Sequence, residues 1–421
     1  MFFLYFFLLM ILVKNYNLRL LLFILLILTY LGITSSYDLV VVLPIMILFI
    51  IIPKLSTESY LLSILFLVGA LLIINYNKFS VIWLGIEIQS FSLISSLFLN
   101  NKLNLDSLES VFKYFLISCI ASSLIVLFIT LIYLNNLNNT INLLSSVNNK
   151  ELLSILMVLP LLFKLGLFPF HIWITDVYMA INLVGIYLIS ILPKITSLLI
   201  LLRIPLIENI VLIIAVISLF LGAIYGINQN SIKLLIGFSG IIHVSIIIIS
   251  IYSKSNFLDP IPVFYLICYI ISIISFLSII IYLNNIEFIY DFFSFFIVKK
   301  FIIVLSLISI LSLLGFPPLI GFWAKLYVLI SLAANKKLFL CFSIILVSLI
   351  SSFFYIRLLN LKFNFENEKL NVWDKIILSD TGVKNEFFYN MTIMIIIIIW
   401  LGGINLDLLM TLSVYLNLII I

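Results

Sequence analysis

The sequence has very little charge and none of the common nucleotide or redox motifs. Only 9% of its 421 residues are Asp, Glu, Lys or Arg, and the mean hydropathy is +1.38. Almost no segment is therefore polar enough to form a soluble domain. The chain contains no Walker loop, no GxGxxG turn and no iron-sulfur cysteine set. We expect it to bind no nucleotide, flavin or cluster itself.

Cysteine is also scarce. Cys119, Cys268 and Cys341 each stand alone in an apolar run, without CxxC or paired spacing, so they support no metal site, disulfide or redox role. The net charge of +5 is spread over short loops, which argues against a nucleic-acid partner. The N-terminal apolar run has no basic region ahead of it and no small-residue cleavage site. It is predicted to be a first membrane span and not a removable signal.

The sequence is rich in long apolar runs, since 65% of its residues are hydrophobic. These runs are continuous, and charges or Asn/Ser clusters separate them. They predict an all-α polytopic membrane protein of about 14 transmembrane helices. Arginine occurs only as Arg19, Arg203 and Arg357, whereas Ile, Leu, Phe, Asn and Lys abound. This bias is typical of AT-rich coding, as in many organellar genomes.

The segment PLLFKLGLFPFHIWITDVY, residues 160–178, combines a deep lysine with a broken helix. Lys164 lies about 18 Å along an apolar run, near the middle of a bilayer core about 30 Å thick. A charge there disfavours insertion by about 2.5 to 3.5 kcal/mol, so the lysine must be paired, hydrated or neutral. Gly166 and Pro169 then interrupt the helix, and freed backbone at that depth needs protein or water to bond it. The segment indicates an aqueous or ionic path through the membrane.

The same break recurs later in the chain. Leu-Gly-Phe-Pro-Pro contains Gly315, Pro317 and Pro318, and the deep Lys325 follows it. Two broken, charged helices five spans apart predict two inverted five-helix repeats. We place these repeats at residues 56–204 and 205–360, after three helices in 1–55 and before a polar loop and a last helix in 361–421. The alternative is that LGxxP recurs by chance in a leucine-rich chain.

Three further ionisable residues lie at mid-depth in their runs. With Lys164 and Lys325 they make a set at one level, and the three are Glu87, Lys194 and His243. Each alone is explained equally well by a structural ion pair or an interhelical hydrogen bond. A set at one depth, in a chain with so few charges, favours a proton or cation relay.

Further expectations concern single residues in or near this set. Lys113 lies only about 9 Å from the start of its run, so a relay role and snorkelling to the surface explain it equally well. We expect Glu87 to reach Lys164 directly or through one water, because either charge alone carries a large desolvation cost. Asp176 is expected to cap the next helix or to neutralise the break, and the next apolar run begins at Tyr178.

Four segments together resemble a known family. They are DSLESVFKYFLIS at 106–118, FKLGLFPFHIWITDVY at 163–178, QNSIKLLIGFSGIIH at 229–243 and LGFPPLIGFWAK at 314–325. In order and spacing they resemble the antiporter-like membrane subunits of proton-pumping NADH dehydrogenase, respiratory complex I. The KYFL motif and the chain length are most similar to the fungal mitochondrial form. The resemblance covers about residues 59–360.

The resemblance implies roles for individual residues. It implies that Glu87, Lys164, Lys194 and Lys325 belong to a central hydrophilic axis that relays protons, and that His243 links the two halves. The chain departs from the family pattern near its first break. Members often carry a proline at the position of Thr175 and a glycine where this chain has Met179 and Ala180.

The resemblance also implies partners and a location. NADH, FMN, iron-sulfur clusters and ubiquinone would be bound by partner subunits, with no cofactor in this chain. Other membrane-arm subunits, accessory subunits and lipids such as cardiolipin would surround it in the mitochondrial inner membrane, and the mitochondrial genome would encode it. Two other classes stay open, namely an Mrp-type cation/proton antiporter subunit and a purely structural membrane subunit.

Overall fold

The computed structural model describes residues 57–100, 105–134, 150–204, 208–252, 260–282 and 300–364. These ranges form twelve α-helices and no β-strand. Seven of the described helices are long and apolar enough to cross a membrane. The predicted polytopic helical fold is thus confirmed, and the total of about 14 spans stays a prediction. The expected helices in 1–55, the polar loop from 365 and the last helix lie outside the described residues.

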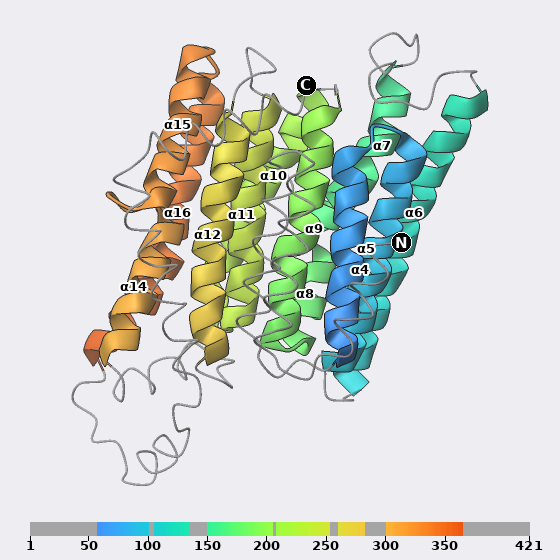
Figure 1. The fold of residues 1–421 in the computed structure, drawn as a ribbon. Coiled ribbons are helices and arrows are strands. Elements are labelled where there is room, and N and C mark those ends of the chain that lie inside the picture. Colours follow the sequence, from blue (N-terminus) through green and yellow to red (C-terminus); the bar gives the residue numbers. More distant parts are fainter. Residues whose placement is uncertain are drawn as a thin grey trace. The chain divides into compact units, whose positions relative to one another are not determined.

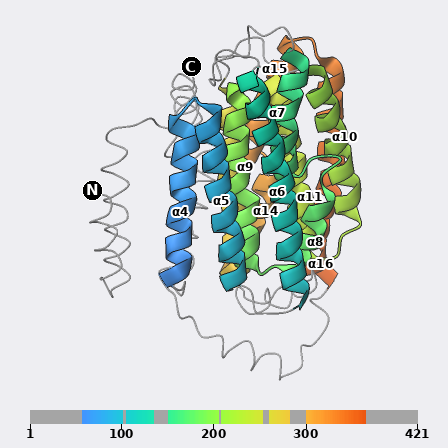
Figure 2. The ribbon, with the colours of Figure 1, turned by 90° about the vertical axis from the view of Figure 1, so that its right-hand side faces the viewer.

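The first of two compact units contains the described residues up to Lys164 together with 191–204. Its helices are α4 (Thr57–Asn75), α5 (Phe79–Asn100), α6 (Leu105–Leu134), α7 (Lys150–Leu165) and the later part of α9 (Leu183–Arg203). Helix α4 packs along α5, and α5 packs along α6 (Figures 1 and 2). Gly69 and Gly85 permit the close α4–α5 crossing, because a Cβ on either would lie 2.7 Å from the other's carbonyl oxygen.

The second unit contains residues 165–190 and the described residues from 208 onward. Its helices are α8 (Ile172–Ala180), α10 (Glu208–Ile227), α11 (Ile232–Tyr252), α12 (Ile261–Tyr282), α14 (Lys300–Leu314), α15 (Ile320–Ala334) and α16 (Leu338–Asn364). Helix α11 forms the centre of this unit. It packs against α8, α10 and α12, and 94% of its membrane-length window is buried.

Contacts inside the second unit repeat contacts inside the first. Arg203 donates to the Ile73 and Ile74 carbonyls at 2.8 and 2.6 Å, at the C-terminal end of α4. Arg357 donates to the Ile227 carbonyl at 3.4 Å, at the C-terminal end of α10. Both arginines follow their carbonyl residue by 130 positions. A cation at this end of a helix is favoured by the helix dipole, and the shared spacing supports the predicted repeat.

The assignment of residues 56–204 and 205–360 to two inverted repeats stays a prediction. Helices α4 to α9 and α10 to α16 follow each other in the order that two repeats would give. The compact units follow this division near residue 205. They depart from it at residues 165–190, which cluster with the second unit through the packing of α8 on α11.

Both predicted breaks coincide with interruptions of a helix. Helix α7 ends at Leu165 and α8 begins at Ile172, while α14 ends at Leu314 and α15 begins at Ile320. Gly166 and Gly315 have φ angles of 69° and 87°, which suit glycine because it has no Cβ. The Phe168–Pro169 and Pro317–Pro318 peptide bonds are cis.

The expected start of the helix after the first break is wrong. Tyr178 belongs to the short helix α8, and the next helix α9 begins only at Leu183. The extended backbone of Ile181, with φ −91° and ψ 151°, ends α8 between them. Asp176 lies inside α8 and is exposed, so it is not the N-cap of that helix.

Candidate functional site

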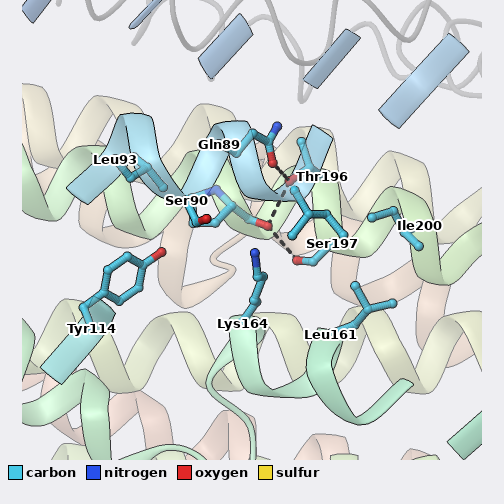
Figure 3. Close-up of a pocket in the computed structure, with 11 residues that line it drawn as sticks. Gln89, Ser90, Leu93, Tyr114, Leu161, Lys164, Thr196, Ser197 and Ile200 are labelled. Atoms are coloured by element: carbon cyan, nitrogen blue, oxygen red, sulfur yellow. Dashed lines mark hydrogen bonds between the residues drawn. The ribbon is translucent and has the colours of Figure 1, made fainter. Parts of the chain in front are cut away.

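Lys164 lies in the last turn of α7, and its side chain enters a small cavity that both polar and apolar side chains line (Figure 3). The polar side chains that line this cavity come from α5, α6 and α9. They are Gln89, Ser90, Tyr114, Thr196 and Ser197. The free volume is about 10 Å³, which is room for about one water molecule. The first unit thus places a lysine against hydroxyl and amide groups inside its helix bundle.

A hydrogen-bonded row forms the wall of the cavity opposite Lys164 (Figure 3). The Thr196 hydroxyl lies 3.0 Å from Gln89 Oε1 and 3.2 Å from the Pro193 carbonyl oxygen. The Ser197 hydroxyl donates to the same carbonyl at 2.6 Å. Gln89 is 4% exposed and Thr196 is 3% exposed, so the row is buried. It joins α5 to α9 next to the lysine.

Glu87 approaches Lys164 but forms no direct ion pair with it. Among the described residues the one ion pair within 4.0 Å joins two other side chains. The Glu87 carboxylate still acts electrostatically on the Lys164 ammonium group. Ser90 lines the lysine's cavity, donates to the Glu87 backbone carbonyl at 2.9 Å and lies 3.5 Å from the Glu87 carboxylate. The predicted contact through one water stays a prediction.

Lys113 faces away from this cavity. Its ammonium group pairs with Glu109 on the same helix at 3.0 Å, and the two side chains are 43% and 67% exposed. Tyr114, the next residue, is 6% exposed and lines the cavity of Lys164. Successive residues of a helix point about 100° apart, so only one of the two can face the site. The choice between a relay role and snorkelling for Lys113 stays open, and the tyrosine of the KYFL motif was missed by the sequence analysis.

Lys194 is buried in α9, with 4% of its surface exposed. It lies in the same helical turn as Pro193 and Thr196, and its backbone carbonyl is 3.1 Å from the Ser197 hydroxyl. The first unit therefore encloses a second lysine beside the hydrogen-bonded row. The predicted row from Lys194 to the ionisable groups of the second unit stays a prediction.

In the second unit, His243 contacts two tyrosines that the sequence analysis did not single out. His243 is 6% exposed, and its Nδ1 lies 3.0 Å from the Tyr265 hydroxyl. The Tyr269 ring centre lies 5.2 Å from the imidazole centre. The two tyrosines are four residues apart on α12, so they occupy one face of that helix. The sequence could have indicated this pair of tyrosines, because they stand four residues apart within an apolar run.

Lys325 is held by the end of the helix that its own break interrupts. Its ammonium group donates to the Leu314 carbonyl at 2.6 Å, and Leu314 is the last residue of α14. Gly315 lies against the lysine chain, since a Cβ there would be 3.0 Å from Lys325 Cδ. A cation is favoured at this end of a helix by the dipole. The second break and its lysine thus form one local structure.

Two other residues near the first break were missed. Lys233 is 7% exposed and donates to the Met179 carbonyl at 3.4 Å, near the end of α8. His171 stacks on Tyr225 with ring centres 6.0 Å apart. Both residues stand in motifs quoted above, in which Lys164 and His243 were singled out instead. Within the described ranges, no three His, Cys, Asp or Glu side chains meet in a way that could hold a metal ion.

Comparison with known proteins identifies a family and a fold. The family model described as "NADH:quinone oxidoreductase/Mrp antiporter, TM" matches residues 77–354. The NADH-ubiquinone oxidoreductase chain 2 of Anopheles gambiae is 34% identical over 190 residues, which are 45% of this chain and 53% of that relative. The chain thus matches about half the length of this relative.

Solved structures share the fold over nearly the whole chain. A chain of respiratory complex I from Thermus thermophilus has a TM-score of 0.77 at 19% identity, covering 93% of this chain and 92% of that one. A chain of the Mrp complex from Dietzia sp. also has a TM-score of 0.77, at 13% identity, covering 91% of this chain and 83% of its own. At such identities the likeness concerns the fold alone.

Proposed function

The chain belongs to the NADH:quinone oxidoreductase/Mrp antiporter membrane family, and we propose that it is a proton-translocating membrane-arm subunit of a complex I-type NADH dehydrogenase. The cavity of Lys164 carries this proposal. A lysine kept only as a structural charge should be paired with a carboxylate, because a lone ammonium group at membrane depth is unfavourable. Lys164 instead faces hydroxyl and amide groups and space for one water. Hydroxyl groups and water can hand a proton on through hydrogen bonds.

The proposed relay consists of Glu87, Lys164, Lys194, His243 and Lys325. Glu87 biases the charge of Lys164 through the electrostatic interaction between them. A movement of either group would change how strongly the lysine holds its proton. His243 and its Tyr265 partner offer a nitrogen and a hydroxyl that can exchange a proton in the second unit. Lys113 and its Glu109 partner are left outside this relay.

The redox chemistry and the energy would come from partner subunits. We propose that these partners bind NADH, FMN, iron-sulfur clusters and ubiquinone, and that conformational or electrostatic changes reach this chain from them. Other membrane-arm subunits, accessory subunits and lipids such as cardiolipin would cover its apolar faces. The insect relative named chain 2 and the AT-rich residue usage support a mitochondrial inner-membrane location and a mitochondrial gene.

A second candidate is a subunit of an Mrp-type cation/proton antiporter. The fold likeness to the Dietzia Mrp complex supports it as well as the likeness to complex I does. The relative named as a subunit of NADH-ubiquinone oxidoreductase favours the first candidate. Co-purification separates them, because the first requires a large quinone-reducing assembly and the second a sodium-dependent proton exchange without one.

The relay is tested with the assembled complex in sealed membrane vesicles. Lys164→Ala should lower NADH-driven proton translocation by at least about tenfold, since a proton-transfer group typically contributes a factor of about a hundred or more. Lys78→Ala is the control, because Lys78 is an exposed lysine between α4 and α5. Equal translocation by both variants, per assembled complex, would show that Lys164 carries no proton.

A further inference from the structure

The Gln89 amide is buried beside Lys164 with only one of its two ends bonded. Its Oε1 accepts from the Thr196 hydroxyl at 3.0 Å, and its Nε2 has no partner among the described residues. If the amide oxygen and nitrogen are exchanged, the oxygen becomes the buried atom without a partner. Either assignment of the amide therefore buries one unbonded polar atom, which is unfavourable. A methionine of similar size would fill the space without burying an unbonded polar atom. Packing alone therefore gives no reason for an amide at this position.

The Thr196 hydroxyl has one proton and two possible acceptors. They are Gln89 Oε1 at 3.0 Å on α5 and the Pro193 carbonyl at 3.2 Å on its own helix. The Pro193 carbonyl already accepts from Ser197 at 2.6 Å. Thr196 can therefore point its proton at Gln89 without leaving that carbonyl unbonded. The direction of this one proton decides where the lone pairs of the Thr196 oxygen lie.

We infer that Gln89, with its Oε1 toward Thr196, is a positioning residue that holds the Thr196 proton on the α5 side of the Lys164 cavity. The Thr196 oxygen is then free to accept a hydrogen bond from the Lys164 ammonium group, directly or through the one water for which the cavity has room. Without the amide the hydroxyl turns its proton to Pro193. Gln89 accepts a hydrogen bond only and takes no proton. The inference rests on the proposed role of Lys164 as a proton carrier.

The arrangement in Figure 3 fits this role. Lys164 points from α7 toward Gln89 of α5 and toward Thr196 and Ser197 of α9, which belong to the hydrogen-bonded row. The row is the polar connection between these two helices at the cavity. A shift of α5 relative to α9 would break the Gln89–Thr196 bond first, because it alone among these bonds joins the two helices.

The test uses the assembled complex in sealed vesicles and compares five variants. Gln89→Met removes the amide and Thr196→Val removes the hydroxyl, each with little change of volume. Each should lower proton translocation by roughly fivefold, as expected for losing one neutral hydrogen bond. The double variant should be no worse than Thr196→Val alone, because Gln89 acts through Thr196. Thr196→Ser should restore translocation, and Ser190→Ala is the control.

Ser190 is suited as the control because it is a buried hydroxyl of the same helix, bonded to the Tyr187 carbonyl at 3.2 Å. Its loss should leave translocation unchanged. All rates are expressed per assembled complex. If Gln89→Met does not assemble, Gln89→Asn replaces it, since the shorter amide cannot reach Thr196 and the same loss is expected.

Three outcomes are decisive. A Gln89→Met variant that behaves like Ser190→Ala overturns the inference, and so do Gln89 and Thr196 effects that multiply in the double variant. In both cases the proposed function stands if Lys164→Ala still abolishes translocation. If Lys164→Ala translocates normally, the proposed function falls, and the inference falls with it.

Discussion

The two helix breaks share a backbone motif, but one lysine precedes its break in the sequence and the other follows its break. Gly166 and Gly315 both have positive φ angles, and each is followed three residues later by a proline. Lys164 precedes its break, in the last turn of α7. Lys325 follows its break, in α15, and returns to the Leu314 carbonyl at 2.6 Å. In both cases the cation belongs to the C-terminal end of the interrupted helix, where the dipole favours it.

The difference concerns what faces each ammonium group. A backbone carbonyl holds Lys325, whereas side chains and a small free volume surround Lys164. A substitution of Leu314 would leave its backbone carbonyl in place as the acceptor. We therefore expect the second break to depend on backbone geometry and the first on its hydroxyl and amide side chains. The following predictions test that contrast, from the largest expected effect to the smallest.

The largest effect is expected from the lysine of the second break. Lys325→Ala should cut proton translocation by about tenfold, because it removes a proposed proton carrier. NADH-to-quinone turnover in uncoupled membranes should fall much less. The two rates are measured on the same vesicles, before and after an uncoupler is added.

Lys337→Ala is the matched control for Lys325→Ala. Its ammonium group also donates to the last carbonyl of a helix, that of Tyr252 at the end of α11, at 3.3 Å. If both variants lose stability but keep the ratio of protons to electrons, Lys325 serves only to cap α14. The relay would then lose its last member.

A smaller effect is expected from adding one methyl group at each break. Alanine at a positive φ costs about 1 to 2 kcal/mol, so Gly166→Ala and Gly315→Ala should both lower the thermal stability of the assembled complex. At Gly315 the new Cβ would lie 3.0 Å from Lys325 Cδ and 3.2 Å from its Nζ, which displaces the ammonium group from Leu314. At Gly166 it would meet the side chain of Ile174.

Only Gly315→Ala should therefore reduce translocation beyond its loss of assembled complex. Thermal inactivation and translocation are compared for both glycine variants at equal amounts of complex. An equal functional loss in Gly166→Ala would contradict the idea that the second break alone ties its lysine to the backbone.

The sequence predicted the positions of the breaks because they follow from local signals, and the depths of the lysines, which rest on an equally local count, stay predictions. Gly and Pro act on their own turn, and depth follows from counting residues along an apolar run. Contacts between helices have no such signal. The Gln89–Thr196 bond joins residues 107 positions apart, and nothing in the pattern around either one announces it. Depth also leaves the direction of a side chain open, which is why Lys113 was singled out and its neighbour Tyr114 was not.

The smallest effect is expected at His243. The Tyr265 phenol is its hydrogen-bond partner in the second unit, as hydroxyl groups line the cavity of Lys164 in the first unit. Tyr265→Phe removes only the oxygen that lies 3.0 Å from His243 Nδ1, so the imidazole loses this hydrogen-bond partner. We expect translocation to fall by roughly threefold, in keeping with the loss of one neutral hydrogen bond.

Tyr252→Phe is the control for Tyr265→Phe, because it removes a buried phenol oxygen on the helix of His243 that has no partner among the described residues. It should translocate protons normally. If Tyr265→Phe does the same, His243 needs no phenol partner for proton transfer. The side chains around the two sites would then differ in role as well as in kind, and the likeness between the two units would be confined to their backbones.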